Sequence, residues 1–364
     1  MVQQYAKPPT WRQTFSLTFR LLTLPAFVML DLVKHLVSGR KGPGLLKYSG
    51  LSAMRYLNKA PYEGLKWLAG TTSANYAAWA KARGIPPIVD GPLIDDASIY
   101  WLGPKRTDKV VLCVPGGGFW AGVNGTALSF WNYVRVELDK QGVHAGYAVL
   151  GYGLYPEASF PTQLRQLAVA FDHLMASGVE PSNIHLVGDS AGSNLILQFL
   201  SHLLHPIDGI GPVQTINGPL GGVYLMSPWL LFESQSKSFL DPTSKDVFDA
   251  AETLAWGKQY ASQVPDSRKP YVEAAAAGPN WFSGLGLIVK HVLISAGSEE
   301  RFLDDAVSFG DTLRNNGGAN VQLEIQEGAV HNEAFLSFIT TDTPSDVGTL
   351  TPVIVQWVKE QLME

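Results

Sequence analysis

The chain has 364 residues, of which 46% are hydrophobic and 16% are charged, and its formal net charge at pH 7 is −5. This apolar content is sufficient to bury a sizeable core. No basic block is present, so we expect no nucleic-acid partner. The single cysteine, Cys113, cannot form a disulfide within the chain, which removes one argument for secretion.

The N-terminal region, residues 1–94, does not alternate strands with helices. Within it, the apolar segment from Leu21 to Leu30 is free of charges and is bounded by Arg20 and Asp31. That segment is shorter than the roughly 20 residues a bilayer span needs, and Pro25 is expected to interrupt a helix there. We therefore expect this mainly helical region to pack on the protein as part of a cap. A helix lying in a membrane interface and a membrane anchor are the alternatives.

Strand-like and helix-like segments alternate from Val110 onward. The expected strands are 110–114, 145–150, 184–187, 223–226, 291–295 and 321–325, and the expected helices are 163–175, 191–204, 302–313 and 353–362. This alternation predicts a mostly parallel sheet covered by helices on both faces. We assign the catalytic domain to residues 95–364. The segment at about 229–285 breaks the alternation and is expected to be a cap insertion above the ligand crevice.

A candidate nucleophile lies between a predicted strand and a predicted helix. Residues 188–192 read Gly-Asp-Ser-Ala-Gly and match the pattern G-x-S-x-G. This strand–turn–helix setting is typical of a nucleophile elbow, in which a sharp turn exposes the serine. The N-terminus of the following helix also favours developing negative charge. The pattern therefore predicts Ser190 as a nucleophile.

A glycine-rich loop follows the strand at 110–114. Gly116, Gly117 and Gly118 offer backbone N–H groups with no side chains in the way, and the N–H of Ala191 is the expected partner donor. The sequence thus predicts an oxyanion hole from these residues, with Gly116 shaping the loop. The glycine spacing matches neither G-x-G-x-x-G nor the P-loop, which argues against a phosphate site. No metal-ligand spacing or cofactor motif is visible, and we expect neither group.

A nucleophilic serine also needs a base and an acid. Of the eight histidines, only His331 follows the last predicted strand. Chain order Ser, acid, His is typical of this architecture, so the acid should follow the strand at 291–295. The loop there offers Glu299 and Glu300. The carboxylates that follow fit the first turn of the next helix, where negative charge is favoured.

Four segments resemble motifs of the hormone-sensitive-lipase-like family of α/β-hydrolases. The family motifs are H-G-G-G-[FW], Y-R-L-A-P-E-x-x-F-P, G-D-S-A-G-G-N-L and S-P-W, and the matching segments are PGGGF at 115–119, YGLYPEASFP at 152–161, GDSAGSNL at 188–195 and SPW at 227–229. The resemblance implies an α/β-hydrolase fold, with a mostly parallel central sheet flanked by helices and a helical cap.

The resemblance also bears on the acid. The family's D-x-L-x-D-[DE] motif, counted back from Asp304, gives Glu300, whereas counting from Gly297 gives Glu299. We take Glu300, because helix packing fixes its register. Two departures from the family stand out. Pro115 replaces the loop histidine, and the acid is Glu instead of Asp.

By resemblance, the expected activity is hydrolysis of a carboxylic ester with a small or medium apolar acyl group. Ser190 would attack the carbonyl, His331 would accept the proton, and Glu300 would orient His331, with an acyl-enzyme as intermediate. The alternatives are acyl transfer or a non-hydrolytic condensation or elimination on a biosynthetic intermediate with the same triad, and a catalytically inactive binding module.

The expected partner is a small-molecule ester or apolar metabolite. We expect an intracellular, cytoplasmic protein. Loose peripheral contact of the N-terminal segment with a membrane, and a homodimer, are left open as further hypotheses.

Overall fold

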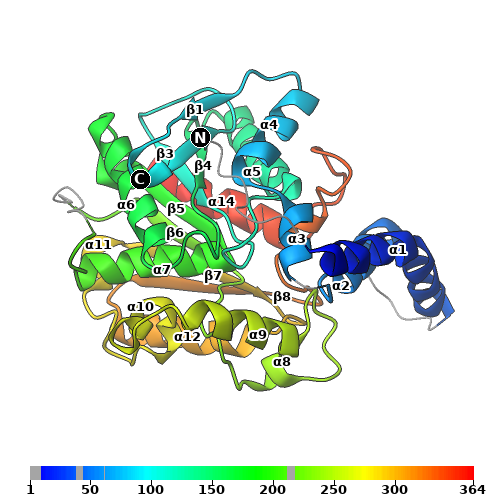
Figure 1. Cartoon of the computed structure of the whole chain (residues 1–364). Coiled ribbons are helices and arrows are strands. Elements are labelled where there is room, and N and C mark those ends of the chain that lie inside the picture. The colour runs from blue at the N-terminus through cyan, green and yellow to red at the C-terminus, as the bar shows by residue number, and fades with distance from the viewer. Residues whose placement is uncertain (1–9, 38–43, 61, 211–217) are drawn as a thin grey trace.

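A single eight-stranded sheet forms the centre of the protein (Figure 1). The computed structural model describes residues 10–37, 44–60, 62–210 and 218–364. The strand order is β1-β2-β4-β3-β5-β6-β7-β8, in which β2 pairs antiparallel with both β1 and β4 and all other pairs are parallel. The strands are β1 Ile88–Asp90, β2 Ser98–Trp101, β3 Val110–Val114, β4 Gly146–Gly151, β5 Ile184–Asp189, β6 Gly222–Met226, β7 His291–Gly297 and β8 Asn320–Gln326.

Helices cover both faces of this sheet. One face packs on α6, α7 and α12, and the other packs on α5 and α14. Strand β3 shows why: Val110, Leu112 and Val114 point into the first core, whereas Val111 and Cys113 point into the second. The bounds are α5 Gly125–Lys140, α6 Thr162–Ala176, α7 Ala191–Leu204, α12 Leu303–Asn316, the short α13 Glu333–Leu336, and α14 Leu350–Met363.

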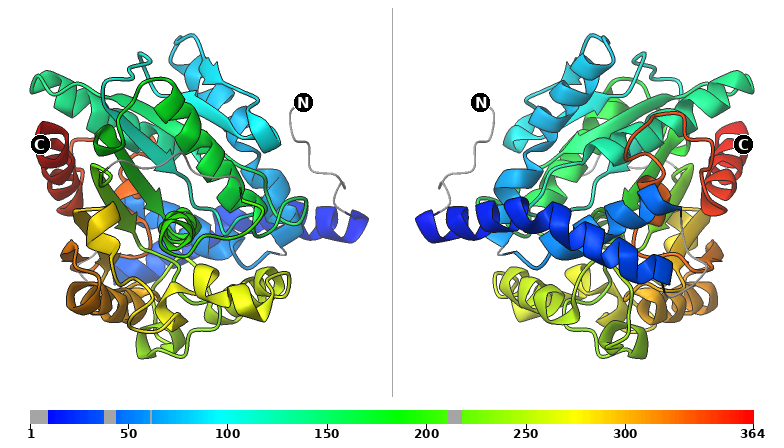
Figure 2. Two further views of the ribbon diagram at one scale, coloured as in Figure 1. Left: turned by 90° about the vertical axis from the view of Figure 1, so that its left-hand side faces the viewer. Right: turned by 90° about the vertical axis from the view of Figure 1, so that its right-hand side faces the viewer.

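Two further helical segments contribute side chains to these cores. The N-terminal one comprises α1 Trp11–Val37, α2 Leu45–Leu57, α3 Tyr62–Ala69 and α4 Thr72–Ala82. The other joins β6 to β7 and comprises α8 Lys237–Leu240, α9 Ala250–Ala261, α10 Lys269–Val272 and α11 Leu285–Ile288. Figure 1 shows α1 and α2 projecting from one side of the body, and the right-hand view of Figure 2 shows α1 running along the outside.

The expected fold class is confirmed, with differences in detail. All six expected strands and all four expected helices are present, within a few residues of their predicted bounds. The expectation that Pro25 interrupts a helix is wrong, because α1 continues through it. Both Pro25 and Leu21, whose carbonyl loses its partner in the helical ladder, are exposed. Any local bend there requires no repacking of a core.

Candidate active site

The predicted site residues all lie in loops that follow the carboxyl ends of parallel strands. Ser190 follows β5, the glycine loop follows β3, Glu300 follows β7 and His331 follows β8. Because these strands are parallel, their carboxyl ends lie at one edge of the sheet, where open α/β sheets bind ligands. Residues from distant parts of the chain therefore meet at one place.

Ser190 lies at the sharp turn between β5 and α7. Its backbone has φ 51° and ψ −118°, a conformation that costs an L residue about 1–3 kcal/mol. The elbow glycines make the turn possible. A Cβ at Gly188 would lie 2.8 Å from the carbonyl carbon of Gly192, and a Cβ at Gly192 would lie 2.0 Å from the carbonyl oxygen of Val114. The end of β3 can therefore pass directly beside the nucleophile elbow.

The glycine loop after β3 presents two unpartnered donors. Gly117 and Gly118 have φ values of 99° and 59°, which glycine adopts without strain. Neither of their N–H groups has a hydrogen-bond partner among the described residues. The N–H of Gly116, by contrast, donates to Asp189 Oδ1 at 3.0 Å. Gly116 therefore holds the loop in place, while Gly117 and Gly118 remain free to bind an oxyanion.

Aromatic packing holds the glycine loop. Phe119 is buried and stacks on Tyr260, with ring centroids 4.5 Å apart. Trp120 packs edge-to-face on Trp256 of α9 at 5.0 Å. The hydroxyl of Tyr152 donates to the carbonyl oxygen of Pro115 at 2.7 Å. The loop is thus fixed from its flanks, without the side-chain hydrogen bonds that a histidine at its start could make.

The His331 imidazole is buried between two phenylalanine rings. Its ring centroid lies 4.8 Å from that of Phe248 and 5.2 Å from that of Phe302, both in edge-to-face geometry. Burial lowers the pKa of His331 to about 3, so the imidazole is neutral at pH 7, as a general base must be. Its Nδ1 has no hydrogen-bond partner within the described residues, which leaves this nitrogen available to an acid.

Glu300 is only 1% exposed and is held at one of its two oxygens. Oε2 accepts hydrogen bonds from the Ser227 hydroxyl at 2.7 Å and from the Gly297 N–H at 2.9 Å. Oε1 has no partner in the described part of the chain. Burial, with added repulsion from Asp246, raises the pKa of Glu300 to about 8. One carboxylate oxygen is therefore free to face an imidazole nitrogen.

The two candidate acids differ in their surroundings. The Glu299 side chain is 36% exposed and forms an ion pair with Lys245 at 3.0 Å. The Ser227 hydroxyl that donates to Glu300 also accepts the N–H of Asn332 at 3.2 Å, directly after the predicted base. The Ser227 hydroxyl therefore joins Glu300 to the loop that carries His331 and Asn332. The ion pair of Glu299 with Lys245, by contrast, lies on the surface.

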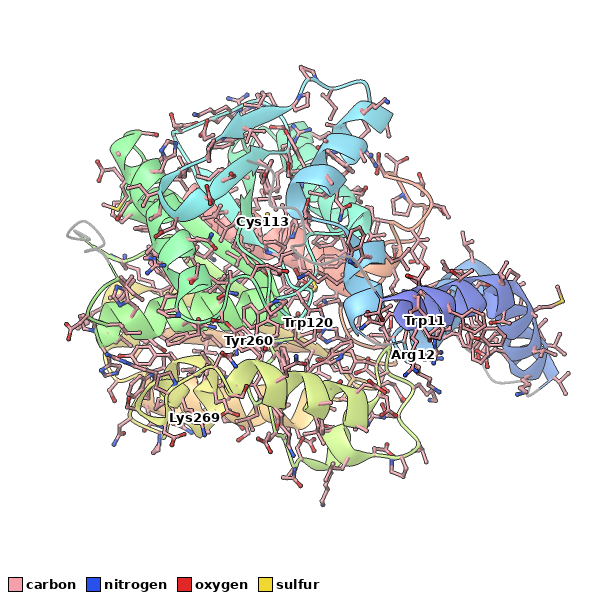
Figure 3. All side chains as sticks on the ribbon, in the orientation of Figure 1. Trp11, Arg12, Cys113, Trp120, Tyr260 and Lys269 are labelled. Carbon is pink, nitrogen blue, oxygen red and sulfur yellow. The ribbon has the colours of Figure 1, made fainter. Side chains whose placement is uncertain are left out.

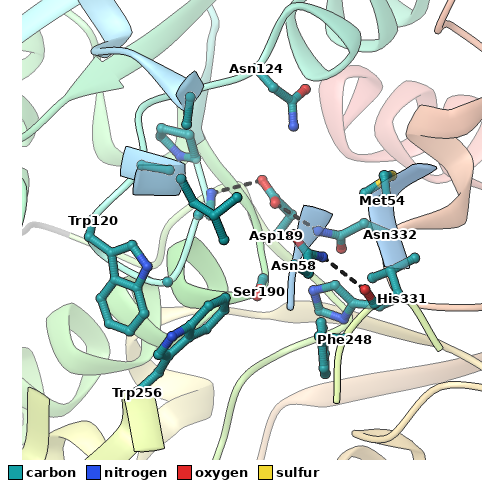
Figure 4. Close-up of a pocket in the computed structure, with 18 of the residues that line it drawn as sticks. Met54, Asn58, Trp120, Asn124, Asp189, Ser190, Phe248, Trp256, His331 and Asn332 are labelled. Carbon is teal, nitrogen blue, oxygen red and sulfur yellow. Dashed lines mark hydrogen bonds between the residues drawn. The ribbon is translucent and has the colours of Figure 1, made fainter. Parts of the chain in front are cut away.

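Asp189 connects the elbow to two other loops. Its Oδ1 accepts the Gly116 N–H, and its Oδ2 accepts the side-chain amide of Asn332 at 2.9 Å (Figure 4). Burial raises the pKa of Asp189 to about 6, so the carboxylate is still mostly ionised at pH 7. A continuous series of hydrogen bonds thus runs from Glu300 through Ser227, Asn332 and Asp189 to Gly116.

A buried carboxylate from the cap insertion also supports the site. Asp246 Oδ1 accepts the N–H groups of Val247 at 2.7 Å and His331 at 3.0 Å, and its Oδ2 accepts the N–H of Arg301 at 2.8 Å. It therefore fixes the backbone at the predicted base and next to the predicted acid. Sequence reasoning missed Asp246 and Asn332, because no motif marks either residue.

Ser190 and His331 face one pocket, together with the glycine loop (Figure 4). The cavity has a volume of about 340 Å³.

Among the described residues, no group of three or more His, Cys, Asp or Glu side chains could hold a metal ion. The pocket walls are mainly apolar and come from α2, α3, the cap insertion and the segment between β7 and α12: Met54, Leu57, Leu65, Leu68, Trp229, Phe248, Trp256 and Phe302. No residue of α1 lines the pocket.

Known proteins resemble this chain in sequence and in fold. The model of the alpha/beta hydrolase fold family matches residues 111–335. An acetyl-hydrolase of Streptomyces hygroscopicus is 28% identical over 228 residues, which cover 61% of this chain and 68% of that protein. An esterase of Acinetobacter venetianus is 26% identical over 202 residues, covering 55% and 60%.

Solved structures extend the likeness in fold. A crystal structure of an esterase from the bacterial hormone-sensitive lipase family superimposes with a TM-score of 0.66 at 20% sequence identity. The superposition covers 88% of this chain and 100% of that one. This chain and that esterase therefore share the same fold.

Proposed function

The chain belongs to the alpha/beta hydrolase fold family, and on that premise we propose that it is a serine carboxylesterase acting on esters of small or medium apolar acyl groups. One observation carries the proposal. Ser190, His331, Gly117 and Gly118 all border the same cavity, and the N–H groups of the two glycines have no hydrogen-bond partner in the described part of the chain. Nucleophile, base and oxyanion donors are the parts that acyl transfer to a serine requires.

In the proposed mechanism, the Ser190 hydroxyl attacks the ester carbonyl while Nε2 of His331 accepts its proton. Glu300 holds Nδ1 of the imidazole through Oε1 and stabilises the charge that develops on the ring. The carbonyl oxygen becomes an oxyanion and receives hydrogen bonds from Gly117, Gly118 and Ala191. His331 then protonates the leaving alcohol. Water, activated by the same imidazole, attacks the acyl-enzyme and releases the acid.

The pocket favours a modest apolar acyl group. Its volume of about 340 Å³ lies near the lower end of the usual range for small-molecule sites, about 300–1,000 Å³. Trp120, Trp256 and Phe302 supply apolar walls that would bind an alkyl or aryl chain by burial. The relatives whose names are acetyl-hydrolase and esterase support the same reaction class.

The decisive experiment combines acid release with active-site labelling. The purified protein should release free acid from an aryl butyrate, measured by titration, and a fluorophosphonate probe should label it. Ser190→Ala should lose both, with a rate loss of up to about 10⁶ as in a well-studied serine protease. Ser177→Ala, at an exposed serine on another part of the surface, is the matched control.

Two outcomes would argue against the proposal. A Ser190→Ala rate within tenfold of the parent would remove the serine mechanism. Labelling of Ser190 without release of free acid, but with formation of a new ester when an alcohol is added, would favour acyl transfer over hydrolysis.

A further inference from the structure

The N-terminal helices carry a charge opposite to that of the rest of the chain. Residues 1–82 contain eleven Lys and Arg against two Asp and Glu, whereas residues 83–364 contain sixteen against thirty. The overall net charge of −5 hides this asymmetry. A segment whose scattered basic residues outnumber its acidic ones is attracted to anionic lipid.

Helix α1 presents an apolar stripe to solvent. None of its 27 residues is buried. Its exposed apolar side chains recur at helical spacing and share one side of the helix, at 51–74% exposure for most of them. The members of this stripe are Trp11, Phe15, Leu22, Met29, Val33 and Leu36. Contact of this apolar stripe with water is unfavourable, so the stripe marks a surface that binds a partner.

The opposite side of α1 packs on α2. The Thr23 hydroxyl is hydrogen-bonded to the Tyr56 hydroxyl at 2.6 Å, and the Phe27 ring stacks on the Tyr56 ring at 4.4 Å. Farther along, the His35 ring stacks on Tyr48 at 3.9 Å. The helix is therefore fixed on the body by one side and displays the stripe on the other, and the right-hand view of Figure 2 shows it on the outside.

Length and composition alone would let α1 cross a membrane, because it is the one helix of the described residues that is long and apolar enough. Two observations favour a different placement. Arg20 and Asp31 lie within the helix. The Arg20 guanidinium donates to the carbonyl oxygen of Tyr56 at 3.2 Å, and a spanning α1 would lose this bond and the other contacts with α2. Amphipathic helices of this kind lie in the plane of the membrane interface.

The helix that carries the stripe also has a basic side chain near each of its ends. Arg12 and Lys34 are exposed near the two ends of α1, and Figure 3 shows Trp11 and Arg12 together on the projecting part of the protein. Such side chains contribute about 1 kcal/mol each near an anionic surface. We propose that α1 docks on an anionic phospholipid surface, lying in its plane with the stripe inserted between the lipids.

The same surface continues to the pocket. Met54 of α2 and Leu68 of α3 are 36% and 49% exposed, and both also line the cavity that holds Ser190. Trp67, Leu45 and Leu46 extend this apolar exposure over the two helices. If the protein hydrolyses esters as proposed above, a docked molecule would receive lipophilic esters directly from the bilayer, without their passing through water.

Vesicle co-sedimentation of the full-length protein tests the docking. Vesicles of phosphatidylcholine with phosphatidylserine should bind the protein at least tenfold more tightly than phosphatidylcholine alone, and high salt should weaken binding. Leu22→Glu/Met29→Glu should lose at least tenfold in binding. The matched control is Ile94→Glu/Leu287→Glu, which places the same charges at sites that are 74% and 80% exposed elsewhere.

Several outcomes would overturn the proposal. Absence of binding by the parent, or equal binding by the stripe variant, would exclude lipid docking through the stripe. Resistance of the membrane-bound protein to alkaline carbonate would show a span instead. A parent dimer that becomes monomeric in the stripe variant, without vesicle binding, would show that a second copy covers the stripe.

The ester readout separates this inference from the proposed function. The stripe variant should hydrolyse a water-soluble ester at the parent rate and lose at least tenfold on a long-chain ester embedded in vesicles. Vesicle binding with no ester hydrolysis by the parent would contradict the enzyme proposal and leave the docking in place. Equal loss on both esters would contradict delivery from the bilayer.

Discussion

Backbone strain gathers around the candidate site at the level of single residues. Six non-glycine residues of the described chain have positive φ, and four of them are Phe119, Ser190, Ser227 and Asn332. Each such conformation costs about 1–3 kcal/mol and persists only where the surroundings enforce it. Here the enforcing contacts are the aromatic stacking of Phe119 and the hydrogen bonds that join the other three residues to their neighbours.

Asn332 offers a test of those contacts. Its side chain joins the loop that carries His331 to Asp189. Its φ of 53° is one that Asn or Gly adopts readily. Asn332→Gly keeps the backbone conformation but removes the bond to a charged acceptor, which is worth about 1.5–3 kcal/mol. We expect kcat to fall about tenfold to 100-fold with KM nearly unchanged, measured with a soluble ester. A loss in KM alone would indicate a role in binding instead.

The choice between the two candidate acids is a second residue-level test. In the proposed mechanism, Glu300→Gln removes the charge that orients the imidazole, a change that costs about 10⁴ in kcat in the best-known triad. Glu299→Gln, the isosteric control on the adjacent residue, breaks an exposed ion pair with Lys245 and should alter kcat less than twofold. A larger loss for Glu299→Gln would show that the family register is off by one.

The pKa shifts predict the pH dependence. His331, with its pKa lowered to about 3, is neutral throughout the working range, whereas Glu300, with its pKa raised to about 8, must lose its proton to orient the base. We therefore expect kcat/KM to rise with pH and to reach half its maximum near pH 8. A profile that is flat between pH 6 and pH 9 would contradict this.

The raised pKa of Glu300 also makes the stability of the folded protein depend on pH. The folded-state pKa of Glu300 is raised from 4.5, so the folded protein binds this proton more tightly than the unfolded chain does. Its contribution to the free energy of unfolding is present below about pH 4.5 and is lost as pH rises toward 8. Between about pH 4.5 and pH 8, the free energy of unfolding of the Glu300→Gln variant should therefore lack the pH dependence that Glu300 contributes. Denaturant titrations at a series of pH values measure this.

The sequence predicted the loops in which the candidate site residues lie, but it did not reveal how these loops are supported. Ser190, His331 and the glycine loop carry local patterns, because an elbow and a post-strand loop are short-range structures. Asp246 acts through backbone groups of Arg301 and His331, more than fifty residues away. Its role depends on how the cap insertion packs on the sheet edge, which no local pattern encodes.

At the level of elements, the buried parallel strands were the easiest to predict. Strand β3, for example, is a run of five apolar residues that ends at a glycine turn. Strands β1 and β2 were missed because they have only three and four residues and precede the alternation. Helix α5 was missed because polar side chains interrupt its apolar face. The continuity of α1 through Pro25 depends on solvent exposure, which the sequence does not show.

The glycine loop is an element whose conformation can be tested through Pro115. Packing of Phe119 and Trp120, and the Tyr152 hydroxyl, hold the loop without a side-chain donor at this position. Pro115→His should therefore keep the hydrolysis of a simple ester within about tenfold of the parent. Tyr152→Phe removes the buried hydrogen bond to the Pro115 carbonyl oxygen and should cost more. The reverse order would mean that proline itself sets the loop.

At the scale of the whole molecule, two segments that are distant in the sequence close the pocket. Helices α2 and α3 supply one wall, and the insertion between β6 and β7 supplies the other. They contact each other directly: Asn58 donates to the carbonyl oxygen of Val247 at 2.8 Å. In the proposed function, substrate selection depends on how these two segments pack, whereas the sheet edge holds the candidate catalytic residues. Within the N-terminal region, which we expected to contribute to a cap, α2 and α3 supply lining residues, whereas α1 supplies none.

Truncation of the chain distinguishes the roles of the N-terminal helices. Deletion of residues 1–37 removes α1 and uncovers Tyr48 and Tyr56 on α2. We expect kcat/KM on a short soluble ester to stay within about threefold, a melting temperature lowered by several degrees because apolar contacts are lost, and loss of vesicle binding.

A second truncation, deletion of residues 1–69, removes α2 and α3 as well as α1 and is compared with the 1–37 deletion. It also removes the wall formed by Leu57 and Leu65, so the acyl pocket opens to solvent. Because apolar burial on that wall contributes to binding, kcat/KM should fall at least tenfold, and the preference for longer acyl chains should weaken. Both truncated proteins should be assayed over a series of acyl chain lengths, with circular dichroism to verify the fold. A shift in chain-length preference as large for the 1–37 deletion as for the 1–69 deletion would mean that α1 shapes the pocket, and would contradict its assignment as a purely external docking helix.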